Sequence, residues 1–298
     1  MDCSKFQAVS IRDAPSVRSP LASDMPSAAE FWRDPRLPWV ESRRACNSRA
    51  CYRPHSHPTW SIGAVDAGES IFSGAPGGQH RLQPGTLVIV PAHRVHACNP
   101  APDTAWSYQM LHLDAAWVEA VSADRQPPDA DAATAALIRI DRIDRSATRY
   151  RMFCHINALL FSSADPGEKE AAVVAFIDEL DVAAGIPIPA RHASPQQHRR
   201  LQPAFALLDA APMSSVSLDD LASCTGMDRY AVIRAFRTVT GLTPHAWQLN
   251  RRINVARERL GQGQPLAEVA HALGFADQSH FQRLFKAHAG ITPGRYRR

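Results

Sequence analysis

Apolar residues are spaced differently in successive stretches of this 298-residue chain. Between residues 38 and 113 they form short runs separated by Pro and Gly, a pattern typical of strands in a barrel or sandwich. Over residues 115–184 and 199–298 they recur at the three- and four-residue spacing of amphipathic helices. The pattern predicts an N-terminal β-barrel with following helices, an α+β domain, and then an all-α C-terminal domain.

The expected strands each lie between turn-forming residues. They are residues 39–45, 50–57, 60–67, 70–73, 79–82, 86–90 and 106–113. Two apolar helical stripes follow, one from Tyr150 to Leu160 and one from Val173 to Leu180. Residues 1–37 are rich in Pro, Ser and Ala, so we expect a flexible N-terminal arm there, with a short helix at 28–33.

The C-terminal stretch contains one helix-turn-helix pattern twice. Each copy has an apolar stripe, a glycine followed by an apolar residue, a phenylalanine and a closing Gly-X-Thr-Pro. These parts are residues 218–222, 226–227, 236 and 241–244 in the first copy, and 266–270, 274–275, 285 and 290–293 in the second. The offset is 48 residues up to the glycine and 49 after it, so the second turn holds one extra residue. Two such copies predict binding to two successive major grooves of duplex DNA.

The second helix of each copy leaves a polar face outward. Asp228 is expected to cap a helix over residues 229–239, and Asp277 to cap one over 278–288. The outward residues are Arg229, Tyr230, Ile233, Arg234 and Arg237 in the first helix, and Gln278, Ser279, Gln282 and Arg283 in the second. Arg pairs with guanine and Gln with adenine, so these faces predict base reading. The alternative for each is an ordinary solvated helix face.

The spacer between the copies and the charge balance support this reading. Thr243 and Pro244 begin an expected helix that ends near Leu260 and would set the distance between the copies. Residues 196–298 carry 14 Lys and Arg against 7 Asp and Glu, a net charge of +7. Residues 1–195 carry 19 against 22, a net charge of −3. A basic C-terminal module joined to a mildly acidic one fits a phosphate-binding domain with a separate sensor.

Residues 199–298 resemble the DNA-binding domain of the AraC/XylS family of bacterial transcription regulators, most specifically at 274–281 and at Phe285-Lys286. The resemblance implies an activator that binds operators with two half-sites per monomer, contacts RNA polymerase and forms a homodimer. By this resemblance, the residues expected to contact DNA bases are Tyr230, Ile233 and Arg234 in the first copy, and Gln278, Ser279, Gln282 and Arg283 in the second. Ile233 departs from the polar residue common there, and would contact a thymine methyl group instead.

Residues 54–57 and 85–96 resemble the cupin pattern, which is also the usual sensor domain of such regulators. Enzymatic cupins hold a metal with three His and a Glu. His55, His57 and His96 match the histidines, but Trp60, Ser61 and Ile62 stand where the Glu is expected. We therefore expect no resident metal and no catalytic residue. Histidines that pack in the barrel and hydrogen-bond to the backbone are the simplest alternative, and a three-histidine metal site is a second.

A small-molecule effector inside the barrel is the favoured reading, because small barrels hold one small ligand. Its expected contacts are Arg53, His55, His57, Trp60, His96, Trp106 and Tyr108, with Phe72 as a further apolar wall. Arg53 and His57 would bind a carboxylate. The rival regulator senses a metal or thiol oxidation through Cys51, His55, His57, His96 and Cys98, which share strand faces if their strands are regular. A cupin enzyme fused to a DNA-binding tail is the alternative of another class.

The chain thus divides into five expected segments. They are the arm (1–37), a cupin-like sensor barrel (38–115), a helical dimerisation region (116–184), a linker (185–198) and the double helix-turn-helix domain (199–298). The helical region could instead simply cover the barrel. Six cysteines without metal or disulfide spacing, no long apolar run and no signal peptide favour a cytoplasmic protein without cofactors or membrane contact.

Overall fold

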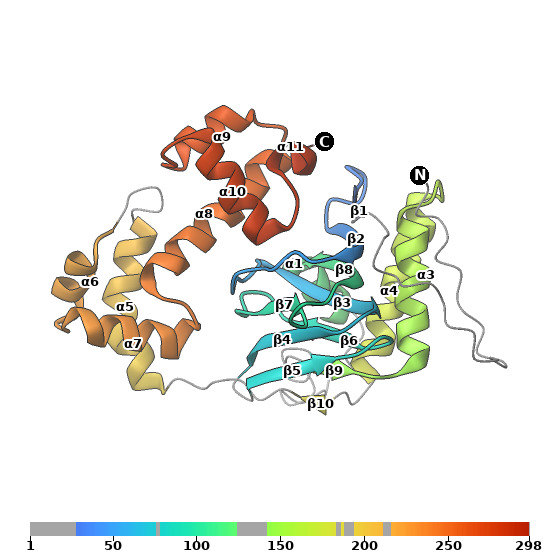
Figure 1. Cartoon of the computed structure of the whole chain (residues 1–298), viewed down its shortest axis with the longest axis horizontal. Helices are drawn as coiled ribbons and strands as arrows, with labels where there is room; N and C mark the ends of the chain where they lie inside the picture. Colours follow the sequence, from blue (N-terminus) through green and yellow to red (C-terminus); the bar gives the residue numbers. More distant parts are fainter. Residues whose placement is uncertain are drawn as a thin grey trace.

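The computed structural model describes residues 28–75, 78–123, 142–182, 186–187, 194–210 and 216–297. It has a β-rich N-terminal domain and a helical C-terminal domain, as the apolar pattern predicts (Figure 1). The C-terminal helices lie along one side of the β-domain, and helices α3 (Ala147–Leu160) and α4 (Pro166–Val182) lie on the opposite side (Figure 1). No helix among the described residues combines the length and apolarity that a membrane crossing requires.

Two antiparallel sheets form the β-domain. The larger has seven strands in the order β1-β2-β8-β3-β6-β9-β10, and the smaller has three in the order β5-β4-β7. The strands are β1 (Ala28–Arg33), β2 (Val40–Ser48), β3 (Thr59–Ala67), β4 (Ser70–Ala75), β5 (Gly78–Leu82), β6 (Leu87–Val90), β7 (Ala97–Pro100), β8 (Trp106–Asp114), β9 (Arg142–Asp144) and β10 (Ile186–Pro187).

The central strands of the larger sheet are buried on both faces, because each face meets a different layer. On β6, Leu87 and Ile89 face one core while Val88 and Val90 face the other. The first core contains side chains of helices α3 (Ala147–Leu160) and α4 (Pro166–Val182). The second lies between the two sheets. Both predicted helical stripes are buried in the first core, which also includes Val118 of helix α1 (Ala115–Ala123).

The C-terminal domain follows the predicted order closely. Its helices are α5 (Pro195–Ala210), α6 (Leu218–Thr225), α7 (Arg229–Thr240), α8 (Pro244–Gly261), α9 (Leu266–Ala272), α10 (Gln278–Ala289) and α11 (Pro293–Arg297). We call α6 and α7 the first head and α9 and α10 the second head. Helix α8 joins the two heads as the predicted spacer (Figure 1).

Several local predictions are wrong. Residues 28–33 form strand β1 instead of a helix, because they pair along their length with β2. Residues 50–57 form no regular strand and contribute only the bridge between His55 and His96, so the face-sharing inferred there does not hold. Strands β7, β9 and β10 were not expected. They are short and pair with distant partners, and β9 and β10 begin inside the region expected to be helical or linker. Residues 1–27 of the predicted arm lie outside the described residues.

Candidate functional site

The first head is a compact helix-turn-helix unit held by local caps. Ser217 and Asp220 form a capping box at the start of α6, and Gly226 ends the helix with a φ of 65°. Asp228 accepts a hydrogen bond from the backbone N–H of Ala231 and so caps α7, as predicted. Val232 and Phe236 of α7 are fully buried.

The second head repeats this plan with a different entry. Helix α9 begins after Pro265, which supplies no side-chain cap, and ends near Leu273 before the turn at Gly274. Asp277 caps α10 by accepting from the N–H of His280, again as predicted. Phe281 and Phe285 fill the core of the head.

The residues predicted to read DNA lie on the solvent side of the two recognition helices, α7 and α10. Tyr230 is 75% exposed, an unusual exposure for a large aromatic side chain. Arg229, Arg234 and Arg237 are exposed on α7, as are Gln278, Ser279 and Arg283 on α10, while Ile233 and Gln282 are half-buried. Arg229 forms an exposed ion pair with Asp219, which phosphate contact would have to replace.

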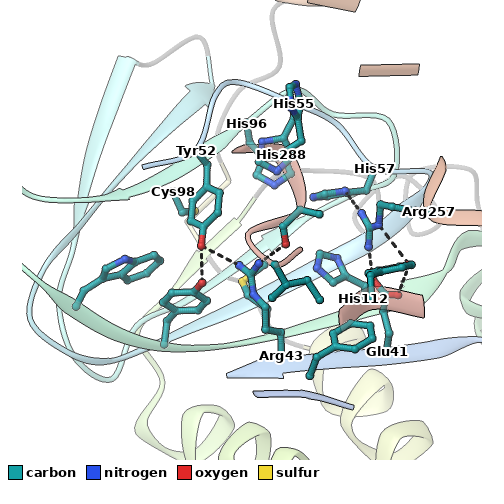
Figure 2. A pocket seen from close by; sticks show the side chains of 17 residues that line it. Glu41, Arg43, Tyr52, His55, His57, His96, Cys98, His112, Arg257 and His288 are labelled. Carbon is teal, nitrogen blue, oxygen red and sulfur yellow. Dashed lines mark hydrogen bonds and ion pairs between the residues drawn. The ribbon is translucent and has the colours of Figure 1, made fainter. Parts of the chain in front are cut away.

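A small cavity, partly open to solvent, lies between the β-domain and the second head. Its β-domain wall comes from the inward faces of β2 and β8 and from the segment around residues 52–57. Its other wall comes from α8, from the end of α10 and from α11 (Figure 2). The lining residues are Phe31, Glu41, Arg43, Tyr52, His55, His57, His96, Cys98, Trp106, Tyr108, Met110, His112, Arg257, His288, Ala289, Ile291 and Tyr296.

A buried ion pair joins the two domains at this cavity. Arg257 of α8 pairs with Glu41 of β2, and both side chains are about nine-tenths buried. Tyr296 donates a hydrogen bond to the same carboxylate at 2.7 Å. Arg257 also donates to Nδ1 of His57 at 2.5 Å, so this imidazole accepts there and is neutral. Breaking such a buried pair on one side leaves an uncompensated charge.

Four buried histidines gather beside this ion pair (Figure 2). The ligand nitrogens of His55, His57 and His96 lie within 4.8 Å of one another, and the His112 ring is 4.8 Å from that of His57. His55 donates from Nδ1 to the carbonyl of Arg53 at 2.6 Å, and His96 donates likewise to Arg94 at 2.9 Å. Burial holds the pKa of all four below the usual value, and Arg257 lowers the pKa of His57 and His112 further.

Arg43 lies across the cavity from this group. It donates to the backbone carbonyl of Ala289, the last residue of α10, and makes a long contact of 3.4 Å with the Tyr52 hydroxyl. Its guanidinium lies over the rings of Tyr52 and Tyr108, whose hydroxyls are 2.8 Å apart. The buried Nε of Arg43 has no hydrogen-bond partner among the residues that the structure describes.

The structure separates the predicted effector residues into two groups. His55, His57, His96, Trp106 and Tyr108 line the cavity together. Arg53 is exposed and does not line it, because the segment that carries it is not a strand and turns the side chain outward. Trp60 packs against the core under α3 and α4, since it shares that face of β3 with Ile62, and Phe72 lies behind His96 in the core between the sheets.

The cavity also contains charged residues that the sequence analysis did not single out. Glu41 and Arg43 occupy alternate positions of an expected strand, and the polar His112 shares one face of another strand with the predicted Tyr108. Charged side chains on an inward strand face were a readable signal. Arg257 and His288 gave no such signal, because only domain docking brings α8 and α10 to the β-domain.

The thiols differ in their surroundings. Cys98 lines the cavity, and burial raises the pKa of its thiol to about 12. A protonated thiol is a poor nucleophile, which weakens the thiol-sensing alternative at this position. Cys51 is exposed outside the cavity.

Comparison with known proteins matches both domains. Residues 38–177 match the AraC-like ligand binding domain, and residues 221–298 match a helix-turn-helix domain. The chain is 23% identical over 255 residues to the uncharacterized HTH-type transcriptional regulator YbfI of Bacillus subtilis, covering 83% of this chain and 87% of YbfI. It is 36% identical over 86 residues to the transcriptional activator NphR of a Rhodococcus species, covering 28% of this chain and 25% of NphR.

The two-domain arrangement also occurs in a solved structure. The apo form of a ToxT variant from Vibrio cholerae aligns with a TM-score of 0.50 at 11% identity, covering 92% of this chain and 98% of that chain. At this identity the likeness concerns the fold alone. The two matching domains and the relatives together identify the chain as a member of the AraC family of transcriptional regulators, with an AraC-like ligand-binding domain before its DNA-binding domain.

Proposed function

We propose that α7 and α10 enter two successive major grooves and read two half-sites of one operator, and that a small-molecule effector in the interdomain cavity controls this binding. The single observation that carries the effector part is the lining of the cavity, which comes from both domains. A ligand there contacts the sensor and the second head at once. It therefore binds the docked and undocked arrangements with different affinity, which is the requirement for shifting their populations.

The spacer helix supports the two-groove reading. Helix α8 has 18 residues, which makes it about 27 Å long. Successive major grooves on one face of DNA are about 34 Å apart, so a helix of this length suits two adjacent grooves. In this proposal the base contacts come from Tyr230, Ile233 and Arg234 on α7 and from Gln278, Ser279, Gln282 and Arg283 on α10. Arg229 and Arg237 contact phosphates.

The remaining parts of the proposal come from the family. We infer a cytoplasmic homodimer that activates transcription through contact with RNA polymerase. Helices α3 and α4 cover the larger sheet with their inner faces, so the proposed dimer contact uses their outer faces. We infer no catalytic step, because the position of the expected cupin glutamate is taken by residues 60–62 of strand β3.

Selection of bound fragments from sheared genomic DNA of the source organism tests the DNA part. We expect a few strong sites that share two short motifs about one helical turn apart. The Gln282→Ala variant should lose preference at one motif only, whereas Glu268→Gln, an exposed change on α9, should behave like the wild type. Diffuse, salt-sensitive recovery without a motif would contradict the two-groove reading.

A metal-sensing regulator is the second candidate, because the nitrogens of His55, His57 and His96 lie close enough to share one ion. Nδ1 of His55 and Nδ1 of His96 each donate to a backbone carbonyl. Nε2 of each ring therefore carries the lone pair that a metal would use, as in many metal sites. The neighbouring Arg257 opposes a dication. Metal analysis of the purified protein tests this candidate. Stoichiometric zinc that disappears in His55→Ala would favour it, and the absence of metal after zinc incubation would exclude it.

A further inference from the structure

Charge in the interdomain cavity is unbalanced among the residues that line it. Arg43 and Arg257 each carry a positive charge, and Glu41 is the acidic lining residue. Burial favours the neutral form of the five lining histidines, His288 included, and of the Cys98 thiol. Glu41 is already paired with Arg257 and accepts from Tyr296, so the cavity holds one positive charge in excess.

The excess charge belongs to Arg43. Among the described residues no carboxylate forms an ion pair with it, and its contacts are the neutral carbonyl of Ala289 and the Tyr52 hydroxyl. A guanidinium removed from water without a counter-ion costs free energy that a bound anion would recover. The site is therefore incomplete in a way that one negative charge corrects.

Arg43 also offers the hydrogen-bonding edge that a carboxylate uses. Within the described part of the chain, its buried Nε has no partner, and Nη2, beside it on the same edge of the guanidinium, has only the 3.4 Å contact with Tyr52. A carboxylate can accept from both nitrogens in a bidentate pair. The adjacent hydroxyls of Tyr52 and Tyr108 give a further donor at the same place (Figure 2).

The rest of the wall indicates what is attached to the carboxylate. Trp106 stacks on Tyr108 with ring centroids 4.2 Å apart, and Met110, Phe31 and Ile291 add apolar surface. Apolar walls with a few convergent polar groups are typical of sites for small organic ligands. A bare inorganic anion would leave these walls uncovered.

The same charges disfavour a metal dication as the ligand. Arg257 donates to Nδ1 of His57, so a guanidinium charge already lies against the histidine nitrogens that a dication would need. Of the two ligand classes, the electrostatics favour the anion.

We propose that the effector is a small monovalent organic anion, a carboxylate on an apolar or aromatic body, and that Arg43 binds its carboxylate. This inference rests on the proposed function, since it names the class of the effector for the same cavity. It also supplies a route to DNA binding. The same guanidinium donates through Nη1 to the carbonyl of Ala289, which ends the second recognition helix, so a carboxylate on its Nε–Nη2 edge would act on that contact.

Calorimetric titration of the purified full-length protein tests the proposal with benzoate and hexanoate as probes. Acetate lacks the apolar body, benzamide lacks the charge, and zinc chloride tests the cation. We expect Kd values below about 1 mM for benzoate or hexanoate, binding about tenfold weaker for acetate, and none for benzamide or zinc. Failure of both apolar carboxylates overturns the proposal, as does equal binding of benzamide. Acetate binding as tight as benzoate binding would overturn the inference that the effector has an apolar body. Zinc binding without carboxylate binding would favour the metal site.

Variants of β2 locate the contact. Arg43→Gln should weaken benzoate binding about tenfold or more, and Arg43→Lys, which keeps the charge, should weaken it less. Arg44→Gln is the matched control, because the neighbouring Arg44 pairs with Glu30 outside the cavity. Thermal unfolding of each variant shows whether it is folded. Unchanged benzoate binding in folded Arg43→Gln would overturn the assignment of Arg43.

Operator binding without any anion separates this inference from the proposed function. If the protein binds its operator specifically and no carboxylate changes that binding, the anion proposal alone is overturned. If the protein binds no DNA sequence specifically, the proposed two-groove function is overturned, whatever binds in the cavity.

Discussion

The two heads share one sequence pattern but differ in what surrounds them. The first head has its own capping box at α6 and packs mainly on α5 and α8, with Leu201 and Leu208 of α5 in its core. The second head lacks a side-chain cap at α9. Its recognition helix ends at the sensor, where Arg43 donates to Ala289 and His288 lines the cavity. The end of α7 also meets the sensor, at Val95, whereas the second head meets it at the charged cavity.

The outward faces of α7 and α10 also differ in their side chains. Helix α7 presents three arginines and the exposed Tyr230, whereas α10 presents mainly short polar side chains and Arg283. The face of the first head suits charge-dependent contacts with DNA. We expect the contacts of the second head with DNA to depend on whether this head is docked on the sensor. The difference indicates that the sensor acts chiefly on the second head, which the following predictions test.

Breaking the interdomain ion pair should have the largest effect. Glu41→Gln leaves the Arg257 guanidinium buried without its carboxylate, a change that costs about 3–5 kcal/mol when the site stays closed. Undocking rehydrates the guanidinium, so the cost should appear as a detached second head. Hydrogen exchange should rise in α10 and α11 and remain unchanged in α6 and α7. Equal exchange in both heads would contradict the asymmetry.

Base-reading residues of the two heads should have separate and smaller effects. Arg234→Ala and Gln282→Ala each remove one candidate base contact, worth about 1–3 kcal/mol of operator affinity. Each loss should be confined to one half-site. Binding to operators with one half-site scrambled measures this. A loss that is the same on both scrambled operators would show that the residue contacts only the backbone or supports the fold.

Acid should loosen the second head before the first. The pKa values of His55, His57, His96 and His112 are lowered by burial, so in the unfolded or undocked chain they take up protons near pH 6.5 while the closed cavity does not. The closed form therefore loses stability as pH falls below about 6.5, by about 1.4 kcal/mol per pH unit for each histidine that stays neutral. The negative charge of Glu41 favours protonated histidines in the closed cavity and so reduces this loss of stability. The positive charges of Arg43 and Arg257, which face the same cavity, disfavour them and increase the loss. Hydrogen exchange of both heads at pH 7.5 and pH 5.5 checks the order of opening. Simultaneous opening would refute it.

Removing the first head's cap should have the smallest effect. Ser217→Ala deletes the side-chain acceptor of the capping box at α6, and should cost about 1 kcal/mol of local stability. Ser223→Ala, at an exposed position of the same helix, is the control. Hydrogen exchange of α6 and operator binding should show a local change that leaves the second head and the cavity unaffected. A change transmitted to α10 would mean that the heads are more tightly coupled than the comparison indicates.

Local chemistry in the sequence determined most of the C-terminal domain. The caps at Asp228, Thr243 and Asp277 and the turn glycines predicted helix boundaries to within one or two residues, because capping and positive φ act over a few neighbours. The apolar runs between Pro and Gly also predicted strands β2, β3, β4, β5, β6 and β8 to within a few residues. The prediction failed at residues 28–33 and 50–57, where pairing with a distant strand, or its absence, overrides local preference.

The composition of the cavity was decided by tertiary structure. The sequence alone indicated a DNA-binding regulator with a sensor, and placed His55, His57 and His96 near a ligand. It named Arg53 where the structure places Arg43 in the cavity, since strand faces and turns together decide which side chains point inward. It contained no sign that Arg257 would meet Glu41, because residues 216 positions apart are joined only by the docking of two domains. Local periodicity therefore determined the elements and their class. Long-range packing, which depends on shape and buried charge, decided the site.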